Sequence, residues 1–428
     1  MQDRLRSIKN NVEGKYRPRL SDTAISEMLS SFGGVLITGP KWCGKSWSGI
    51  RHANSVVFAD DDATKERAAL DPRSVLDGDY PMLVDEWQES PKLWDAARRE
   101  IDFNTKKGLF IFTGSVTPPT DSASHSGTGR FAVVQMRPLS LFESGDSKGT
   151  VSLSRLFSEG RTDPVPSESG YLETVRLICR GGWPAGVWGG AGDATRIPQQ
   201  YLNTVARSDI SRPDGKSRDP SIVRKVMRSV ARNSATMVKS SVISADVSCD
   251  GGRVSDQTVR AYLESLKQIF MIEEQKAWTP SLRSKTRIRA SPKIHFTDPS
   301  LAAAALNASP DVLSRDPKTA GLLFESLCHR DVCAYSDSMT GEVCHYRDDS
   351  GLEADSIIQL ADGRWGAVEV KLGPHEYDKA ASSLSRLKEK VCDEAGEPSF
   401  LMILSGSGGM AYTRPDGVTV VPIDCLGP

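Results

Sequence analysis

One short segment carries the residues needed to bind a nucleoside triphosphate. Residues 39–46, GPKWCGKS, match the pattern G-x-x-x-x-G-K-[ST] of a phosphate-binding loop and follow the apolar run Val35–Thr38. In such a loop the backbone N–H groups point at phosphate oxygens, close to the positive end of a helix. The sequence therefore predicts an ATP site formed by Gly39, Pro40, Lys41, Trp42, Cys43, Gly44, Lys45 and Ser46.

Hydrolysis of the bound triphosphate would need two acidic residues in addition to the loop. Lys45 is expected to reach the β- and γ-phosphates, and the hydroxyl of Ser46 to hold Mg²⁺. The apolar run Pro81–Val84 ends in Asp85 and Glu86. Asp85 is the expected carboxylate on the metal side, and Glu86 the group that activates the attacking water. Taken alone, adjacent carboxylates at a strand end are also typical of a solvated turn.

Two more candidates follow later in this region. The run Phe110–Thr113 leads into Gly114 and Ser115. If this strand lies between the first two, either Thr113 or Ser115 places a hydroxyl near the γ-phosphate, and the sequence does not choose between them. Arg130 is a candidate to stabilise charge in the transition state, from the same subunit or from a neighbour. If Arg130 acts on the nucleotide of a neighbouring subunit, the subunits must contact one another head-to-tail in a ring or filament. The alternative is that Arg130 is a surface arginine without a role in catalysis.

The elements that must position these residues suggest an α/β fold. Five short apolar runs alternate with helical or polar stretches, which is typical of a mostly parallel sheet with helices on both faces. We expect this domain over residues 1–143, a connection over 144–170, a helical region over 171–315 and a small α/β domain over 316–428. Within 171–315, helices followed by two extended segments suggest a winged helix-turn-helix.

The composition of the chain limits the classes of protein to which it can belong. The chain has 428 residues, of which 38% are hydrophobic and 25% charged, and its net charge is −1. Nucleic-acid binding would therefore need a local basic patch. Neither a long apolar run nor a secretory leader is visible, which predicts no membrane span. Eight cysteines without C-x-x-C pairs fit a reducing compartment, so we expect a cytoplasmic protein.

A family resemblance extends over nearly the whole chain, from about Tyr16 to Leu404. In order, GVLITGPKWCGKS, MLVDEWQ, FIFTGS, GRFAVVQMRPLSLFE, GGWPAG, SPKIHFTDPSLAAAAL, GLLFESLCHRD and EADSIIQLADGRWGAVEVKLG resemble AAA-type ATPases with a C-terminal uncharacterised domain. The resemblance implies ATPase roles for Lys45, Ser46, Asp85 and Glu86, and a role for Arg130 as an arginine finger. It also implies a winged helix and a terminal domain with a restriction-endonuclease-like fold. Gly49 departs from the pattern, because a good helix former is expected there.

The C-terminal region contains a second candidate site. Glu325, Asp355, Glu369 and Lys371 follow the order E…D…E-x-K of restriction-type nucleases, which use carboxylates on a divalent metal and a nearby lysine. Glu369 and Lys371 share one face of a strand, since side chains at i and i+2 do so. An inactive scaffold or binding module is the alternative reading.

Basic residues cluster where the wing of the winged helix would lie. This patch extends from Lys276 to Lys293, and with Arg260 of the preceding helix it predicts contacts to DNA phosphates through Arg283, Lys285, Arg287 and Arg289. A second basic stripe comprises Arg224, Lys225, Arg228 and Arg232. Two functions remain open: an ATPase coupled to DNA, and a regulatory or chaperone-like ATPase acting on a protein partner. In both, a homo-oligomer is expected.

Overall fold

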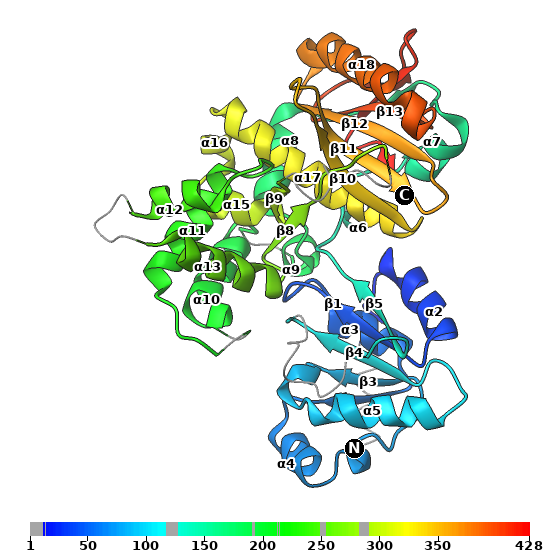
Figure 1. The fold of residues 1–428 in the computed structure, drawn as a ribbon, viewed down its shortest axis with the longest axis vertical. Coiled ribbons are helices and arrows are strands. Elements are labelled where there is room, and N and C mark those ends of the chain that lie inside the picture. Colours follow the sequence, from blue (N-terminus) through cyan, green and yellow to red (C-terminus); the bar gives the residue numbers. More distant parts are fainter. Residues whose placement is uncertain are drawn as a thin grey trace. The chain divides into compact units, whose positions relative to one another are not determined.

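The computed structural model describes Val12 and residues 14–116, 127–190, 193–211, 213, 215–248, 254–281 and 291–428. The chain forms two compact units, one mainly from residues 1–138 and the other from most of residues 139–428 (Figure 1). Within the described residues, no helix has both the length and the apolar character that crossing a bilayer requires.

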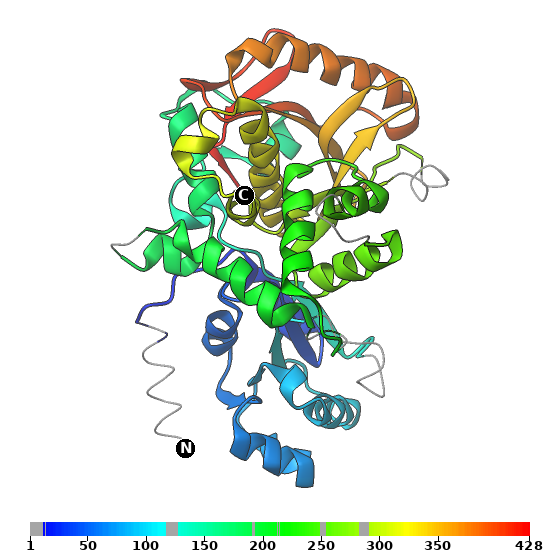
Figure 2. The ribbon, with the colours of Figure 1, turned by 90° about the vertical axis from the view of Figure 1, so that its left-hand side faces the viewer.

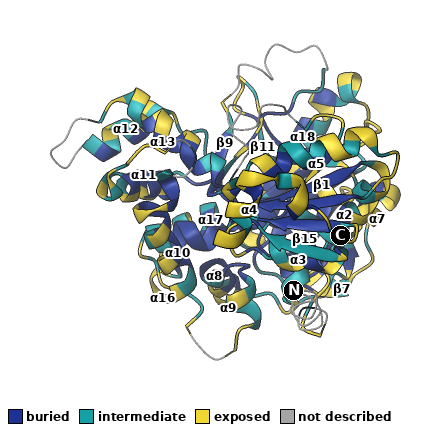
Figure 3. Cartoon of the chain, turned by 90° about the horizontal axis from the view of Figure 1, so that it is seen from below, coloured by how far each residue is buried: buried dark blue, intermediate teal, exposed yellow. Residues whose placement is uncertain are grey.

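The first unit is built on a five-stranded parallel sheet, as the sequence predicts. The strand order is β2-β3-β4-β1-β5, so β4 lies between β1 and β3. The strands are β1 (Gly34–Thr38), β2 (Ser55–Phe58), β3 (Met82–Asp85), β4 (Phe110–Gly114) and β5 (Phe131–Gln135). The central strands β1, β3 and β4 are buried along their whole length (Figure 3).

Helices cover both faces of this sheet. They are α2 (Ser21–Ser31), α3 (Lys45–His52), α4 (Asp62–Leu70) and α5 (Lys92–Phe103). Val35 and Ile37 of β1 pack in a cluster with α2 and α3, whereas Leu36 packs in another with α4 and α5. Because successive side chains of a strand point to opposite faces, a strand covered on both faces must be apolar throughout. This explains the uninterrupted apolar runs.

The second unit contains a helical region. Its helices are α8 (Tyr171–Arg180), α9 (Pro184–Trp188), α10 (Arg196–Arg207), α11 (Pro220–Arg232), α12 (Ser240–Ser248), α13 (Asp256–Gln268), α15 (Pro299–Ala305) and α16 (Pro310–Leu313). Strands β8 (Ile272–Gln275) and β9 (Lys293–Phe296) follow α13 and pair antiparallel as a two-stranded ribbon. The hydroxyl of Ser255 accepts a 3.1 Å hydrogen bond from the backbone of Thr258, and so caps the N-terminus of α13.

The same unit contains a seven-stranded mixed sheet, ordered β10-β11-β12-β13-β15-β14-β7. Its strands are β7 (Val165–Pro166), β10 (Gly341–Arg347), β11 (Glu353–Leu360), β12 (Trp365–Lys371), β13 (Phe400–Ser405), β14 (Met410–Thr413) and β15 (Val418–Pro422). Helices α17 (Pro317–Asp337) and α18 (Tyr377–Ala395) lie on opposite sides of the sheet (Figures 1 and 2). The apolar side of α18 packs on the sheet through Leu384, Leu387 and Val391.

Residues expected to form a connection belong to this second unit. They include β6 (Val151–Ser152) and α7 (Leu153–Glu159), and the short helix α6 (Leu141–Ser144) ends at the first of these residues. Strand β6 pairs with β16 (Leu426–Gly427) near the C-terminus, and β7 pairs with β14. Thus the segment joins the edge of the C-terminal α/β domain.

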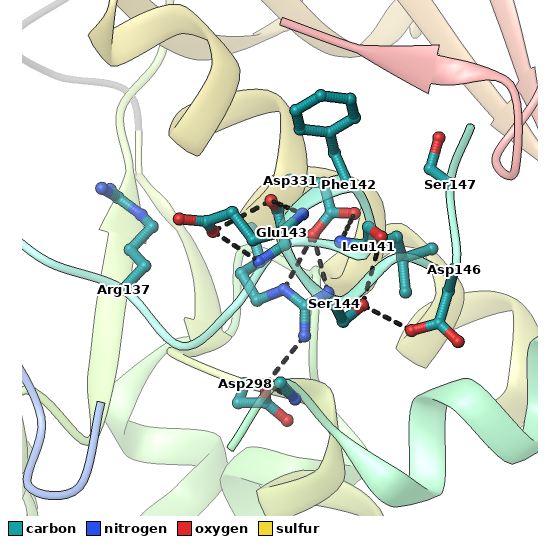
Figure 4. Close-up of polar contacts among 12 residues, drawn as sticks. Arg137, Leu141, Phe142, Glu143, Ser144, Asp146, Ser147, Asp298 and Asp331 are labelled. Atoms are coloured by element: carbon teal, nitrogen blue, oxygen red, sulfur yellow. Dashed lines mark hydrogen bonds and ion pairs between the residues drawn. The ribbon is translucent and has the colours of Figure 1, made fainter. Parts of the chain in front are cut away.

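Several family-like motifs meet around Asp298 and Asp331 (Figure 4). Arg330 is only 1% exposed and pairs with Asp298 at 2.8 Å and with Asp331 at 2.7 Å. Asp298 also accepts a hydrogen bond from the backbone of Gly182, and Asp331 accepts one from the backbone of Leu141, each at 2.9 Å. A buried charge is tolerated only where partners compensate its lost hydration. These motifs therefore build the core of the second unit.

Candidate nucleotide site and a second charged centre

The loop after β1 has the backbone that its glycines predict. Gly39 and Gly44 have φ angles of 145° and 108°. A Cβ on Gly39 would lie 2.2 Å from the carbonyl oxygen of Met136, so no other residue fits there. Lys45 Nζ donates a 2.8 Å hydrogen bond to the carbonyl of Pro40, and its side chain therefore curls back over the loop. Trp42, with φ 65°, leaves its ring exposed.

Helix α3 starts at Lys45, directly after the loop, and packs tightly on the sheet at Gly49. A Cβ on Gly49 would lie 2.9 Å from Leu83 Cδ1 and 3.2 Å from Thr113 Cγ2. The glycine that breaks the helical pattern is therefore needed for contact with β3 and β4. Its low helix propensity is offset by this close approach of helix and sheet.

Asp85, at the end of β3, is the meeting point of three elements. The Thr113 hydroxyl of β4 donates to its carboxylate, and the Ser46 hydroxyl of α3 is near enough to affect the pKa of Asp85. Burial raises the pKa of Asp85, and the two hydroxyls oppose that rise. Carboxylate and hydroxyl oxygens are the ligands that Mg²⁺ prefers. Ser46 and Asp85 thus fit the magnesium role predicted for them.

Glu86 adopts a left-handed backbone conformation, with φ 51°. Non-glycine residues in this region cost about 1 kcal/mol or more and often mark functional positions. Its carboxylate accepts hydrogen bonds from Gln88 and, at 3.3 Å, from the hydroxyl of Ser115. Both candidate hydroxyls are therefore close to the acidic pair: Thr113 contacts Asp85, and Ser115 contacts Glu86.

Arg19, which lies outside the sequence motifs, also contacts the loop. Its buried guanidinium donates to the carbonyl of Cys43 at 2.7 Å and to the carbonyl of Arg137 at 2.9 Å. It therefore ties the loop to the chain that leaves β5. Nothing in the local sequence separates Arg19 from its basic neighbours, because its role depends on tertiary packing.

Arg130 lies away from the other predicted residues of its own subunit. It precedes β5, whose first residue pairs with Gly34 at the start of β1, whereas the loop follows the end of β1. At roughly 3.3 Å per residue, five strand residues separate the two edges by about 16 Å. Arg130 Nε instead pairs with Asp102 of α5 at 2.8 Å.

The second candidate site is assembled in the C-terminal domain. Lys371 Nζ lies 2.6 Å from Glu369 Oε2 and 3.6 Å from Asp355 Oδ2. Glu325 of α17 joins them through Lys293 of β9, whose Nζ lies 2.5 Å from Glu325 Oε1 and 3.5 Å from Asp355 Oδ1. The four predicted residues therefore come together, with Lys293 as a fifth member.

The charges of this centre are strongly perturbed. Burial raises the pKa of Glu325 to about 8 and that of Glu369 to about 7. Asp355 is buried as well, but Lys293 and Lys371 hold its pKa below the usual value. The two lysines therefore keep Asp355 ionised, whereas burial favours the protonated forms of Glu325 and Glu369.

The basic patch differs from the prediction at Lys293. This lysine is only 6% exposed and belongs to the charged centre, so it is not part of a basic surface. Arg283, Lys285, Arg287 and Arg289 lie outside the described residues. Arg260 is exposed, but it pairs with Asp256 at 2.7 Å along α13.

Comparisons with known protein families divide the chain into three successive regions. Residues 31–144 match the AAA domain, residues 172–312 the domain of unknown function DUF8612, and residues 320–426 the domain of unknown function DUF4143. No curated protein matches the chain.

Three solved structures are similar at low identity. A Walker-type ATPase of Pyrococcus abyssi is 16% identical over 68% of this chain and 98% of its own, with a TM-score of 0.40. The replication initiator DnaA bound to AMPPCP and single-stranded DNA is 13% identical over 58% and 86%, with a TM-score of 0.28. A Vibrio cholerae protein is 9% identical over 95% and 92%, with a TM-score of 0.20. At these scores the likeness does not establish a shared function.

The domain matches, rather than these distant structures, show which domains the chain contains. An AAA domain is followed by a DUF4143 domain near the C-terminus, as the motifs predict. The chain thus combines an AAA domain with a C-terminal domain of unknown function, the arrangement of the AAA-type ATPases that its motifs resemble.

Proposed function

We propose that this protein binds ATP with Mg²⁺ and hydrolyses it at the loop of residues 39–46. The main support is the carboxylate of Asp85, which accepts a hydrogen bond from Thr113 and lies near the Ser46 hydroxyl. Three elements distant in sequence thus place oxygen ligands and a lysine-bearing loop together. This arrangement suits the binding of a triphosphate and its metal ion.

In the proposed reaction, the loop N–H groups and the ammonium of Lys45 hold the phosphates. Lys45 must then exchange its hydrogen bond to the Pro40 carbonyl for phosphate oxygens. Ser46 and Asp85 would hold Mg²⁺, which neutralises charge on the phosphates when bound. Glu86 orients the attacking water and accepts its proton, and the hydrogen bonds from Gln88 and Ser115 position the Glu86 carboxylate.

The test separates binding from chemistry. We expect Lys45→Ala to lose ATP affinity, and Glu86→Gln to retain ATP while hydrolysing it at least about a hundredfold more slowly. Glu89→Gln is the matched control, because Glu89 is an exposed neighbour that pairs with Lys65 at 3.3 Å. Binding can be measured by calorimetry and turnover by phosphate release. Normal turnover in Glu86→Gln would remove Glu86 from the mechanism.

We further propose that nucleotide state is coupled to DNA through the helical region. The order α11, α12, α13 and ribbon is that of a winged helix. Exposed Arg224, Arg228 and Arg232 recur every four residues along α11 and so lie along one side of it, although Arg232 also approaches Asp246 at 3.5 Å. Such a stripe would bind phosphates in a salt-dependent way.

The competing proposal is a regulatory or chaperone-like ATPase acting on a protein partner. Measuring ATPase activity with and without duplex DNA, at low and moderate salt, discriminates between the two. Stimulation that weakens with salt and is lost in Arg224→Ala/Arg228→Ala supports DNA coupling. Equal activity with and without DNA supports the protein-partner alternative.

A further inference from the structure

The charged centre of the C-terminal domain receives one of its cations from a different family region. Lys293 belongs to the ribbon within the DUF8612 match, whereas Glu325, Asp355 and Glu369 belong to the DUF4143 match. The side chain of Lys293 is 8% exposed, and its ammonium group contacts both Glu325 and Asp355. The lysine therefore lies inside the cluster.

The ribbon holds Lys293 firmly in this position. Lys293 pairs in the ladder with Gln275 of β8, whose buried amide donates to the Asp355 carbonyl at 2.9 Å. Two residues further along the same face, His295 contacts the hydroxyl of Ser326 at 3.0 Å. Both strands of the ribbon are thus attached beside the carboxylates. Withdrawing the lysine would break these buried contacts as well.

A restriction-endonuclease-like fold leads us to expect a divalent cation among these carboxylates, but the residues do not fit one. One oxygen of Asp355 faces Lys293, and the other accepts a 2.8 Å hydrogen bond from the Val370 backbone while facing Lys371. Glu325 and Glu369 each contact an ammonium group. Among the described residues, no group of three or more acidic, histidine or cysteine side chains is arranged to hold a metal ion.

We propose that the ammonium group of Lys293 takes the place of the divalent cation among Glu325, Asp355 and Glu369. The centre is then a metal-free anchor that joins the ribbon to the α/β domain. Three carboxylates face two lysines, so even with every carboxylate ionised the net charge is only −1. Little negative charge is left to offset the dehydration of a divalent ion.

Removing the internal cation should expose the metal site that it replaces. The experiment uses full-length, chelator-treated protein without nucleotide, titrated with Mn²⁺ and followed by calorimetry and electron paramagnetic resonance. We expect Asp355→Asn to leave the Mn²⁺ stoichiometry of the wild type unchanged. Lys293→Met should gain about one Mn²⁺ per chain, and Lys293→Met/Asp355→Asn should lose it again, because carboxylate oxygens are the required ligands.

Lys276→Met is the matched control. Lys276 lies just after β8, its side chain is 73% exposed, and it approaches Glu342 at 3.5 Å, so its loss should add no Mn²⁺. A wild-type Mn²⁺ site that Asp355→Asn abolishes would overturn the proposal, as would a folded Lys293→Met protein that gains none. If circular dichroism shows that Lys293→Met does not fold, the wild type and Asp355→Asn decide the question: equal stoichiometry supports the anchor, and a lost ion refutes it.

Discussion

The guanidinium of Arg19 donates a 2.7 Å hydrogen bond to the carbonyl of Cys43, inside the phosphate-binding loop. A second hydrogen bond joins it to the Arg137 carbonyl after β5. Because the loop must present its N–H groups in one conformation, a buried cation that fixes it from behind reduces the entropy lost on binding. Arg19 is therefore a positioning residue.

We predict that Arg19→Met weakens ATP binding by roughly tenfold, equivalent to about 1.4 kcal/mol. Hydrogen bonds from charged groups contribute about 1.5–3 kcal/mol each, but part of this is recovered when the loop closes around the ligand. Isothermal titration calorimetry measures the effect. Arg17→Met, which replaces an exposed arginine of the same segment, should bind ATP as the wild type does. Equal affinities for the two variants would contradict this role.

Gly49→Ala should destabilise the first unit by about 1–3 kcal/mol, because the added methyl overpacks α3 against Leu83 and Thr113. Helix propensity alone predicts the opposite, a gain of about 1 kcal/mol. Gly321→Ala in α17 is the control, since its Cβ would meet only Leu372, at an ordinary 3.7 Å. Scanning calorimetry should show a lower transition temperature for the first variant only. A raised transition in Gly49→Ala would show that the helix has room to move.

Arg130→Ala should bind ATP nearly normally and hydrolyse it about a thousandfold more slowly, as expected for loss of an arginine finger. Because Arg130 lies at the far edge of its own sheet, we expect it to act on a neighbour's nucleotide. Mixing Arg130→Ala with Lys45→Ala subunits should then restore part of the phosphate release. Arg98→Ala, which removes the other arginine paired with Asp102, should stay active. Mixtures no faster than their components would exclude action in trans.

Glu325→Gln should stabilise the protein increasingly as pH rises. Burial raises the pKa of Glu325 from 4.5 to about 8, so the folded state keeps a proton that the unfolded state loses. The contribution of Glu325 to the free energy of unfolding is therefore complete below pH 4.5. It decreases as the pH rises to about 8, by at most about 1.4 kcal/mol per pH unit. Glutamine does not titrate. The melting-temperature difference between variant and wild type should rise from pH 5 to pH 8; a constant difference would contradict the shift.

The fold of the first unit was predictable because its signals are local. A strand, a glycine-rich loop and a helix lie contiguously from Val35 to His52, and their spacing alone predicts the phosphate site. Strands buried on both faces leave apolar runs that need no knowledge of their partners. Asp85 and Glu86 could be assigned for the same reason, since parallel strands end at one edge of a sheet.

Residues whose role depends on distant partners could not be assigned in this way. Gly49 looks unfavourable within its helix, and only the close approach of Leu83 and Thr113 explains it. Lys293 looks like one more cation of a basic patch, yet it is buried beside Glu325, 32 positions away. Sequence spacing does not report burial, and burial decides whether a lysine is a surface charge or an internal ion-pair partner.

Local signals in the sequence predict the AAA domain, the phosphate-binding loop, the acidic pair and the order of the C-terminal motif. Only the folded chain shows that Arg19 donates a hydrogen bond to the loop, that Arg130 lies away from it, and that Lys293 lies within the carboxylate cluster. The two kinds of feature differ in the distance along the chain over which they act. Backbone geometry and alternating burial depend on a few consecutive residues, whereas charge pairing in a dry interior depends on which segments pack together.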